Sequence, residues 1–454
     1  MRNHRLWTWL SLVVVIATTA CSGLRAAGAA DLAPSAGDGA PRLRTLVLML
    51  DGVPYDVVDS LWRAGHFADF RPPSKVISTF PALTEVAFGS IWHERPQGYE
   101  DRYFNTEENR IEGGLLEHLF KPAEHGNFRR HVDIGPGGVS ATLAYVFPTP
   151  IARRELDRLR DRLLEEAPRD TAVVAYLMAT DAIAHRSGRE ELVRYLLSVE
   201  RFLEELRSRY GPGLEIVLFS DHGNELIPTK RAPLEEALEA AGFDLVSAIE
   251  DENDVVVPRF GLVGSAFFYA APSAESRLAE ALAGAEGVEL VFFDDSTGRV
   301  HVWGREGRAV IDASGDGTRY RYQPIEGDPL ALADAAASLR RRGLMDADGF
   351  APDSAWLQAT VETPYIDSLR RIVAGLRSAV RNPANVVVSF APGYHFGSRA
   401  ADLLVDVTGT HGSLRTESAL AFFMSTHTAA PTLLRSEALL KHLPGRPAEL
   451  VRAP

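Results

Sequence analysis

The stretch LEIVLFSDHG, residues 214–223, gives the strongest indication of the fold, because an unbroken apolar run ends abruptly in an acid and an imidazole. Apolar runs without alternation are typical of parallel strands covered by helices on both faces. Two further runs have the same character, LRTLVLMLDG (43–52) and TAVVAYLMATD (171–181). Each of the three runs ends with an aspartate near its carboxyl end: Asp51, Asp181 and Asp221.

Amphipathic segments between these runs predict helices over residues 150–167 and 189–211. Strands that alternate with helices indicate an α/β fold, with a doubly wound, mostly parallel sheet and helices on both faces. Ligands of such sheets bind beyond the carboxyl ends of the strands. We therefore expect the three aspartates to lie together at one edge of the sheet.

The alternation of apolar strands and amphipathic helices becomes weaker between residues 233 and 382, where we predict a smaller α+β insertion or cap. This region contains short strand-like pieces, LVFFDD, RVHVWG and TRYRYQ, among scattered Gly and Pro. Two segments in it predict helices, residues 273–285 and 329–342.

Strong patterning returns after the predicted insertion. The segments NVVVSFAPGY (385–394) and ALAFFMST (419–426) are apolar again, and the second predicts a further core strand. The core is therefore expected to consist of residues 43–232 and 383–454.

The first 21 residues have the pattern of a secretory signal. Basic residues are followed by an apolar stretch from Leu6 to Ala20, which is shorter than the roughly 20 residues that span a bilayer. Cys21 is placed as in the lipobox of bacterial lipoproteins, although Thr18 replaces the usual Leu or Val. We expect a lipid anchor at Cys21, a flexible tether over residues 22–42, and a periplasmic or cell-envelope location. Ordinary signal cleavage is the alternative.

The composition excludes several kinds of site. With 46% hydrophobic and 24% charged residues, the 454-residue chain has the composition of a globular protein. Its formal net charge of −13 argues against a nucleic-acid-binding surface, which needs clustered Lys and Arg. Cys21 is the only cysteine, so the chain has neither an internal disulfide nor a cysteine-based metal site.

Carboxylates and imidazoles occur where a metal centre would need them. His185 follows Asp181 by four residues in TDAIAH, so one helical turn would place both on the same face. With the SDHG and GTHG segments, the chain supplies three carboxylates and three imidazoles, enough for two three-ligand sites. Such ligands favour zinc over manganese. The six candidates are Asp51, Asp181, His185, Asp221, His222 and His411.

The segment STFPALTEVAFGSIW, residues 78–92, predicts a helix that begins near Thr84. A threonine at a helix start often only caps the helix. It can also be a nucleophile, because the helix dipole and nearby metal ions would favour its alkoxide. The residues alone leave both interpretations open.

The ordered series LMLDG, STFPALTE, TDAIAH, SDHG and GTHG resembles the alkaline phosphatase superfamily, especially its nucleotide pyrophosphatase/phosphodiesterase branch. The resemblance covers most of residues 44–230 and 386–427. It implies that Thr84 is the nucleophile, with Thr79 as the alternative, because some relatives place the threonine directly before FP. Asn105 stands where that branch carries an asparagine that binds a phosphate oxygen, although such an asparagine is otherwise a turn residue.

The resemblance also implies two divalent metal ions, Zn²⁺ before Mn²⁺, with the Thr84 oxygen at the second ion. Their charges, those of three aspartates and that of a Thr84 alkoxide sum to zero, so an anionic phosphoryl group could approach. The implied ligands are Asp181, His185 and His411 for one ion, and Asp51, Asp221 and His222 for the other.

The implied activity is hydrolysis of small phosphate esters through a covalent phospho-threonine intermediate. Monoesterases of the superfamily carry an arginine directly after the nucleophile, whereas Glu85 follows Thr84 here. The exchange favours diesters, pyrophosphates or phosphonates over monoesters. The alternatives are an envelope phosphoryl-group transferase of the same fold and a non-catalytic metal-binding lipoprotein.

Overall fold

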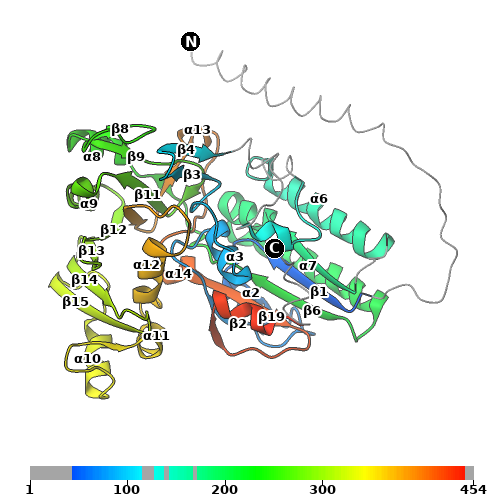
Figure 1. Ribbon diagram of the computed structural model, residues 1–454. Helices are drawn as coiled ribbons and strands as arrows, with labels where there is room; N and C mark the ends of the chain where they lie inside the picture. The colour runs from blue at the N-terminus through cyan, green and yellow to red at the C-terminus, as the bar shows by residue number, and fades with distance from the viewer. Residues whose placement is uncertain (1–42, 115–126, 138–142, 167–170, 445–454) are drawn as a thin grey trace, which may run out of the picture. The chain divides into compact units, whose positions relative to one another are not determined.

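The computed structural model describes residues 43–114, 127–137, 143–166 and 171–444 (Figure 1). The predicted signal peptide, the lipidation of Cys21 and the tether lie outside these residues. Within the described ranges, no helix combines the length and the apolar character needed to cross a membrane.

A six-stranded sheet forms around the three apolar runs, in the order β20-β2-β19-β6-β1-β5. Strand β1 lies between β6 and β5, is parallel to both, and aligns Leu50 with Ser220 and with Leu177. Only β19 runs in the opposite direction. The strands are β1 (Thr45–Leu50), β2 (Ser74–Ile77), β5 (Ala172–Leu177), β6 (Glu215–Ser220), β19 (Leu420–Ser425) and β20 (Leu433–Arg435). The predicted α/β fold with a mostly parallel sheet is confirmed.

Both faces of this sheet are covered. In β1, β5 and β6, every residue after the first is buried, although successive side chains point to opposite faces. The helices whose side chains join this core are α2 (Tyr55–Arg63), α3 (Thr84–Trp92), α6 (Pro148–Arg160) and α7 (Ala179–Tyr210). Helix α7 contains both the TDAIAH turn and the helix predicted from residue 189, and the two parts meet at a kink at Gly188.

A second, nine-stranded sheet has the order β16-β15-β14-β13-β12-β17-β11-β9-β8. The strands are β8 (Asp244–Leu245), β9 (Asp254–Val256), β11 (Ser265–Ala270), β12 (Val288–Asp294), β13 (Val300–Gly304), β14 (Gly307–Ala313), β15 (Arg319–Gly327), β16 (Ala351–Pro352) and β17 (Val386–Phe390). The strand-like pieces predicted in the insertion are β12, β13 and β15. Strand β17 was expected in the core, but it pairs with β11 and β12, because its apolar residues complete the centre of this sheet.

The remaining elements surround the two sheets. The helices predicted over residues 273–285 and 329–342 are the shorter α9 and α10. These helices and their neighbours are α8 (Leu234–Ala240), α9 (Glu275–Ala283), α10 (Ala333–Arg341), α11 (Asp353–Thr360), α12 (Ser368–Arg377), α13 (Arg399–Asp402) and α14 (Thr416–Ala419). Two small sheets are β10-β18-β7 (Leu262–Val263, Tyr394–Gly397, Lys230–Arg231) and β3-β4 (Arg102–Asn105, Arg110–Gly113).

The segment that leads into α3 contributes to the cores of both large sheets. Phe80, Leu83 and Val86 belong to the core of the nine-stranded sheet, and the Phe80 ring lies 5.2 Å from that of Phe292. Phe88, two residues after Val86 and therefore on another face of α3, belongs to the core of the six-stranded sheet. The position of Thr84 is therefore held from two sides.

Candidate metal centre and active site

The three aspartates come together near the carboxyl ends of β1, β5 and β6. Asp51 and Asp221 directly follow the last residues of β1 and β6, whereas Asp181 lies in the first turn of α7. All three are at most 1% exposed. Gly52 allows this close approach, since a Cβ atom there would lie 2.4 Å from Asp181 Oδ1.

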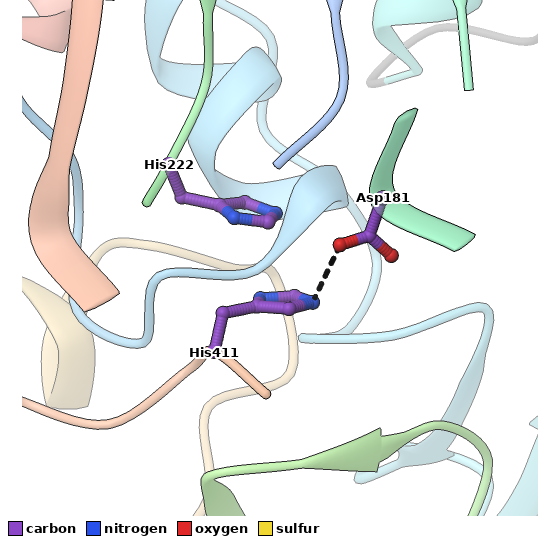
Figure 2. Close-up of side chains that lie close together, drawn as sticks. All are labelled: Asp181, His222 and His411. Atoms are coloured by element: carbon purple, nitrogen blue, oxygen red, sulfur yellow. Dashed lines mark ion pairs between the residues drawn. The ribbon is translucent and has the colours of Figure 1, made fainter. Parts of the chain in front are cut away.

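Asp181, His222 and His411 form the first group that can hold a metal ion (Figure 2). One ligand atom from each residue lies within 4.8 Å of the other two. His411 Nε2 is 3.6 Å from Asp181 Oδ1, and the rings of His222 and His411 stack with centroids 3.8 Å apart. The two imidazoles therefore face the same carboxylate.

His185 lies beside this group. Its Nε2 is 3.4 Å from the other oxygen of Asp181, Oδ2, and its ring centroid is 5.0 Å from that of His411. The structure thus brings Asp181, His185 and His411 together, and it adds His222, which the sequence assigned to the other ion.

Asp51, Asp221 and His222 form the second group. His222 Nε2 lies 3.3 Å from Asp221 Oδ2 and 3.6 Å from Asp51 Oδ1. Because His222 belongs to both groups, the two candidate sites are adjacent.

The chemistry of the donor set fits divalent cations. Asp181 Oδ1 and Asp221 Oδ2 are buried without a hydrogen-bond partner, and such carboxylates are costly unless a cation balances them. Burial, and then the neighbouring carboxylates, raise the pKa of Asp51 and that of Asp221 well above their usual range. A cation between them would remove this cost.

The histidines are prepared as neutral ligands. Nδ1 of His411 lies 2.7 Å from the carbonyl oxygen of Ala82, and Nδ1 of His222 lies 2.9 Å from that of Gly223. Since a carbonyl oxygen only accepts, Nδ1 donates in both contacts, and Nε2 presents its lone pair to the aspartates. Burial lowers the pKa of His222 and lowers the pKa of His185 to about 4, so both rings are neutral at pH 7.

Two tyrosines that sequence reasoning missed orient the carboxylates. Tyr145 Oη donates to Asp181 Oδ2 over 2.7 Å, and Tyr176 Oη donates to Asp51 Oδ2. Such hydrogen bonds fix a ligand's orientation. Tyr176 carries the only polar side-chain atom of β5, which was the signal available in the sequence.

Thr84 is the first residue of α3 and faces the second group. Its Oγ1 lies 3.2 Å from Asp51 Oδ1 and 3.4 Å from His222 Nε2. The alternative, Thr79, donates its hydroxyl to the carbonyl oxygen of Pro81 over 2.8 Å. Its hydroxyl is thus engaged by its own loop, whereas that of Thr84 lies among candidate ligands.

Asn105 ends β3 and organises the turn to β4. Its Oδ1 accepts hydrogen bonds from the backbone N–H groups of Glu107 and Glu108, each 3.1 Å long. This contact matches the turn residue that the sequence offered as the other interpretation. Binding of a phosphate oxygen by Asn105 stays a prediction.

Gly223 is required by a close approach of the chain. Its φ is outside the left-handed region, so backbone conformation alone does not demand a glycine. A Cβ atom there would instead lie 2.2 Å from the carbonyl oxygen of Glu417 and 2.8 Å from that of Leu420. The close approach of this neighbouring segment requires glycine beside His222.

Glu155 supports the start of α7, which carries Asp181 and His185. Its Oε2 accepts the backbone N–H of Ala179 over 2.9 Å, while its Oε1 is buried without a partner. Burial raises the pKa of Glu155 from 4.5 to about 7.

This raised pKa predicts how stability depends on pH. The protonated Glu155 carboxyl contributes fully to the free energy of unfolding below about pH 4.5. This contribution is lost as the pH rises through about 7, because the folded protein then holds an unfavourable buried charge. Glu155→Gln keeps an acceptor for Ala179 without that charge. We expect the difference in unfolding free energy, Glu155→Gln minus wild type, to increase by up to about 3 kcal/mol when the pH is raised from 4.5 to 8. Urea denaturation of the metal-loaded proteins measures this difference. A difference that stays constant with pH would contradict this.

A comparison with protein families supports the resemblance noted above. Residues 61–285 match the family described as type I phosphodiesterase / nucleotide pyrophosphatase. The predicted resemblance to that branch is thereby confirmed, and the family consists of hydrolases of phosphoric esters. A search of curated proteins found no match to this chain.

Solved structures with a similar course of the chain include murine ectonucleotide pyrophosphatase / phosphodiesterase 5, with 11% identity and a TM-score of 0.46. Phosphonoacetate hydrolase from Sinorhizobium meliloti 1021, in complex with phosphonoformate, has 14% identity and a TM-score of 0.43. Each comparison covers 88% of this chain and 94% of the other. Identities this low say nothing about the substrate.

Proposed function

Since residues 61–285 match the model of the type I phosphodiesterase / nucleotide pyrophosphatase family, we propose that this chain hydrolyses phosphodiesters or pyrophosphates with Thr84 as its nucleophile. The observation that carries the proposal is the position of Thr84 Oγ1, within 3.2 Å of Asp51 and 3.4 Å of His222, which belongs to both ligand groups. A threonine that only capped a helix would not need this neighbourhood.

Thr84 and the groups around it would catalyse hydrolysis in two steps. The hydrogen bond to Asp51 orients the Thr84 hydroxyl, whose oxygen attacks phosphorus and expels the ester alcohol, leaving the phosphoryl group on Thr84. Water then cleaves the phospho-threonine bond and restores the hydroxyl. Because Thr84 begins α3, free backbone N–H groups of the first helical turn favour the negative charge that develops there.

The candidate ligands would hold two divalent ions, Zn²⁺ before Mn²⁺. When bound, such ions stabilise an alkoxide and the charge on phosphoryl oxygens. The residues that would hold them are Asp181, His185 and His411 for one ion, and Asp51, Asp221, His222 and the Thr84 oxygen for the other.

Glu85, the residue after Thr84, favours a substrate whose phosphate group carries a single negative charge. Glu85 forms an ion pair with Arg129, so this position offers no free cation to a doubly charged phosphate monoester. A diester phosphate carries one charge less and needs less compensation. Diesters or pyrophosphates are therefore favoured over monoesters.

Turnover of matched chromogenic substrates tests the proposal. The purified, Zn²⁺-loaded protein should hydrolyse bis(p-nitrophenyl) phosphate at least about tenfold faster than p-nitrophenyl phosphate, measured as kcat/KM. EDTA should abolish both activities, and added Zn²⁺ should restore them. If neither substrate is turned over while two ions are bound, a non-catalytic metal protein is the better interpretation. Product formation only with an added alcohol would favour the transferase.

A further inference from the structure

A cluster of four arginines lies apart from the candidate metal centre, around the small sheet β10-β18-β7. Arg231 ends β7, Arg259 precedes β10, and Arg399 follows β18. The pairing of Leu262 with Gly397 places Arg399 beside the segment that contains Arg259. The fourth arginine is Arg102 at the start of β3, whose charge acts on Arg259 and whose segment is tied to Gly261 by Glu100. Four separate segments thus bring arginines together beside this sheet.

Three of these arginines share a single carboxylate. Glu235 is 3% exposed and forms a two-pronged ion pair with Arg231. Its Oε1 also lies 3.6 Å from Arg259 Nη1 and 3.4 Å from Arg399 Nε. Among these arginines only Arg231 hydrogen-bonds to Glu235, and the other two guanidinium groups make only electrostatic contacts with the carboxylate.

Several donors of the cluster are therefore unused. Within the described part of the chain, the side chains of Arg102, Arg259 and Arg399 donate no hydrogen bond, although each guanidinium has five N–H donors. Nε of Arg259 and Nε of Arg231 are buried without a partner. Buried donors of this kind are costly unless a ligand satisfies them.

The cluster also has uncompensated charge. Four guanidinium groups and the Glu235 carboxylate leave a local excess of three positive charges in a chain whose formal net charge is −13. In the described part of the chain, the nearby acids Glu100 and Asp402 form no ion pair with these arginines: Glu100 accepts the Gly261 N–H over 2.7 Å, and Asp402 lies 2.8 Å from His395 Nε2. Their negative charges offset part of the excess but leave the cluster positive. An anion would relieve the repulsion.

The pKa of Arg259 reflects this surplus. Burial lowers it, and the neighbouring Arg231, Arg399 and Arg102 lower it further, against the opposing effect of Glu235. The side chains remain accessible, because 29% of Arg259 and 58% of Arg399 are exposed. A solute anion can therefore reach the unused donors.

Two short paths connect the cluster to the candidate metal ligands. Thr229 pairs with Val407, and the next residue, Thr408, donates its N–H to the carbonyl oxygen of His185 over 2.7 Å. Arg231 lies two residues beyond Thr229, about 7 Å along an extended strand. On the other side, Gly264 N–H donates to the His411 carbonyl oxygen over 2.6 Å, a few residues after Arg259.

We propose that Arg102, Arg231, Arg259 and Arg399 form an anion subsite for a second negatively charged group of the substrate, a carboxylate or a phosphate. The proposal rests on the proposed function and narrows it. The preferred substrates are phosphodiesters or pyrophosphates that carry a further anionic group some atoms away from the phosphorus that reacts. The guanidinium forks suit both anions, because each presents paired oxygens.

Matched substrates test the subsite. A p-nitrophenyl phosphodiester is prepared with an alkyl chain that ends in a carboxylate, in a phosphate monoester, or in an uncharged methyl ester, over a series of chain lengths. For the best length, the wild type should prefer an anionic end over the methyl ester by about tenfold or more in kcat/KM, mainly through KM. The preference should weaken with added salt. The carboxylate and phosphate arms show which anion fits better.

Single substitutions test whether the arginine cluster causes the preference for an anionic substrate. Arg259→Gln, or the more exposed Arg399→Gln, should reduce the ratio towards one and leave the kcat/KM of the methyl ester within about twofold. Arg341→Gln on α10 is the matched control and should change nothing. Equal ratios in the wild type and in both cluster variants, with unchanged thermal midpoints, would overturn the subsite.

A binding measurement separates failure of the subsite from failure of the proposed function. If the wild type hydrolyses none of the esters, the proposed function fails, but the subsite remains testable with inorganic sulfate. Calorimetry on EDTA-treated protein should then show that sulfate binds about tenfold more weakly to Arg259→Gln than to the wild type. Equal sulfate affinity would mean that the arginines only stabilise the fold around Glu235.

Discussion

Thr84→Ala is expected to lower the kcat for bis(p-nitrophenyl) phosphate by about 10⁴-fold, or about 5 kcal/mol of transition-state stabilisation. The reason is that the alanine has no oxygen to attack phosphorus, whereas its backbone can still begin α3. Metal content should stay near the wild-type level, because all six Asp and His ligands are retained and only the Thr84 oxygen is lost. Initial rates and elemental analysis of the same preparation measure both quantities.

Two controls separate a nucleophile from a structural threonine. Thr84→Ser retains the hydroxyl and should keep measurable activity, and Thr79→Ala should lose little, since the Thr79 hydroxyl bonds within its own loop. Acid-quenched wild-type reactions should contain a peptide phosphorylated at Thr84, detected by mass spectrometry. Full activity of Thr84→Ala would show that Thr84 is not the nucleophile. A phosphorylated Thr79 would identify Thr79 as the nucleophile instead.

The positions of the candidate ligands were predictable because they depend on short-range patterns. An apolar run without alternation predicts a buried parallel strand, and strands with a shared register place their carboxyl ends together. Asp51 and Asp221 follow from that reasoning alone. The spacing of Asp181 and His185 follows from one helical turn.

What the sequence could not predict depends on contacts between distant segments. His222 faces both ligand groups because His411, 189 residues later, stacks on its ring, and no local pattern contains that contact. Gly223 is needed because Glu417 and Leu420, which lie far from it in the chain, approach it closely. Strand β17 has the same apolar character as β6, so composition could not tell which sheet it joins.

The arginine cluster also depends on contacts between segments that are distant in the sequence. Arg102, Arg231, Arg259 and Arg399 are scattered over almost 300 residues, and each one alone reads as a solvated surface charge. Only the pairing of β10 with β18, and of β18 with β7, reveals that three of them share Glu235. Charge excess therefore has to be judged in space, since the chain as a whole is acidic.

Asp221→Asn is expected to remove metal and activity together. Asp221 is fully buried, its Oδ1 accepts the Gly52 N–H over 3.1 Å, and its Oδ2 lies 3.3 Å from His222 Nε2. The asparagine amide can still accept from Gly52, but it has no negative charge and no second oxygen for a cation. Metal per chain should therefore fall, and kcat/KM at limiting Zn²⁺ should fall by about 100-fold or more.

The same substitution should have the opposite effect on the metal-free protein. Without cations, Asp51, Asp181 and Asp221 repel one another in a buried site, so neutralising one of them should raise the metal-free thermal midpoint by a few degrees. EDTA should lower the midpoint of the wild type markedly and that of Asp221→Asn only slightly, because only bound metal stabilises the folded state. Asp334→Asn, on the exposed face of α10, should behave as the wild type in both states. If Asp221→Asn instead kept its metal and destabilised both forms equally, Asp221 would be a structural acid, and the second metal site would need another ligand.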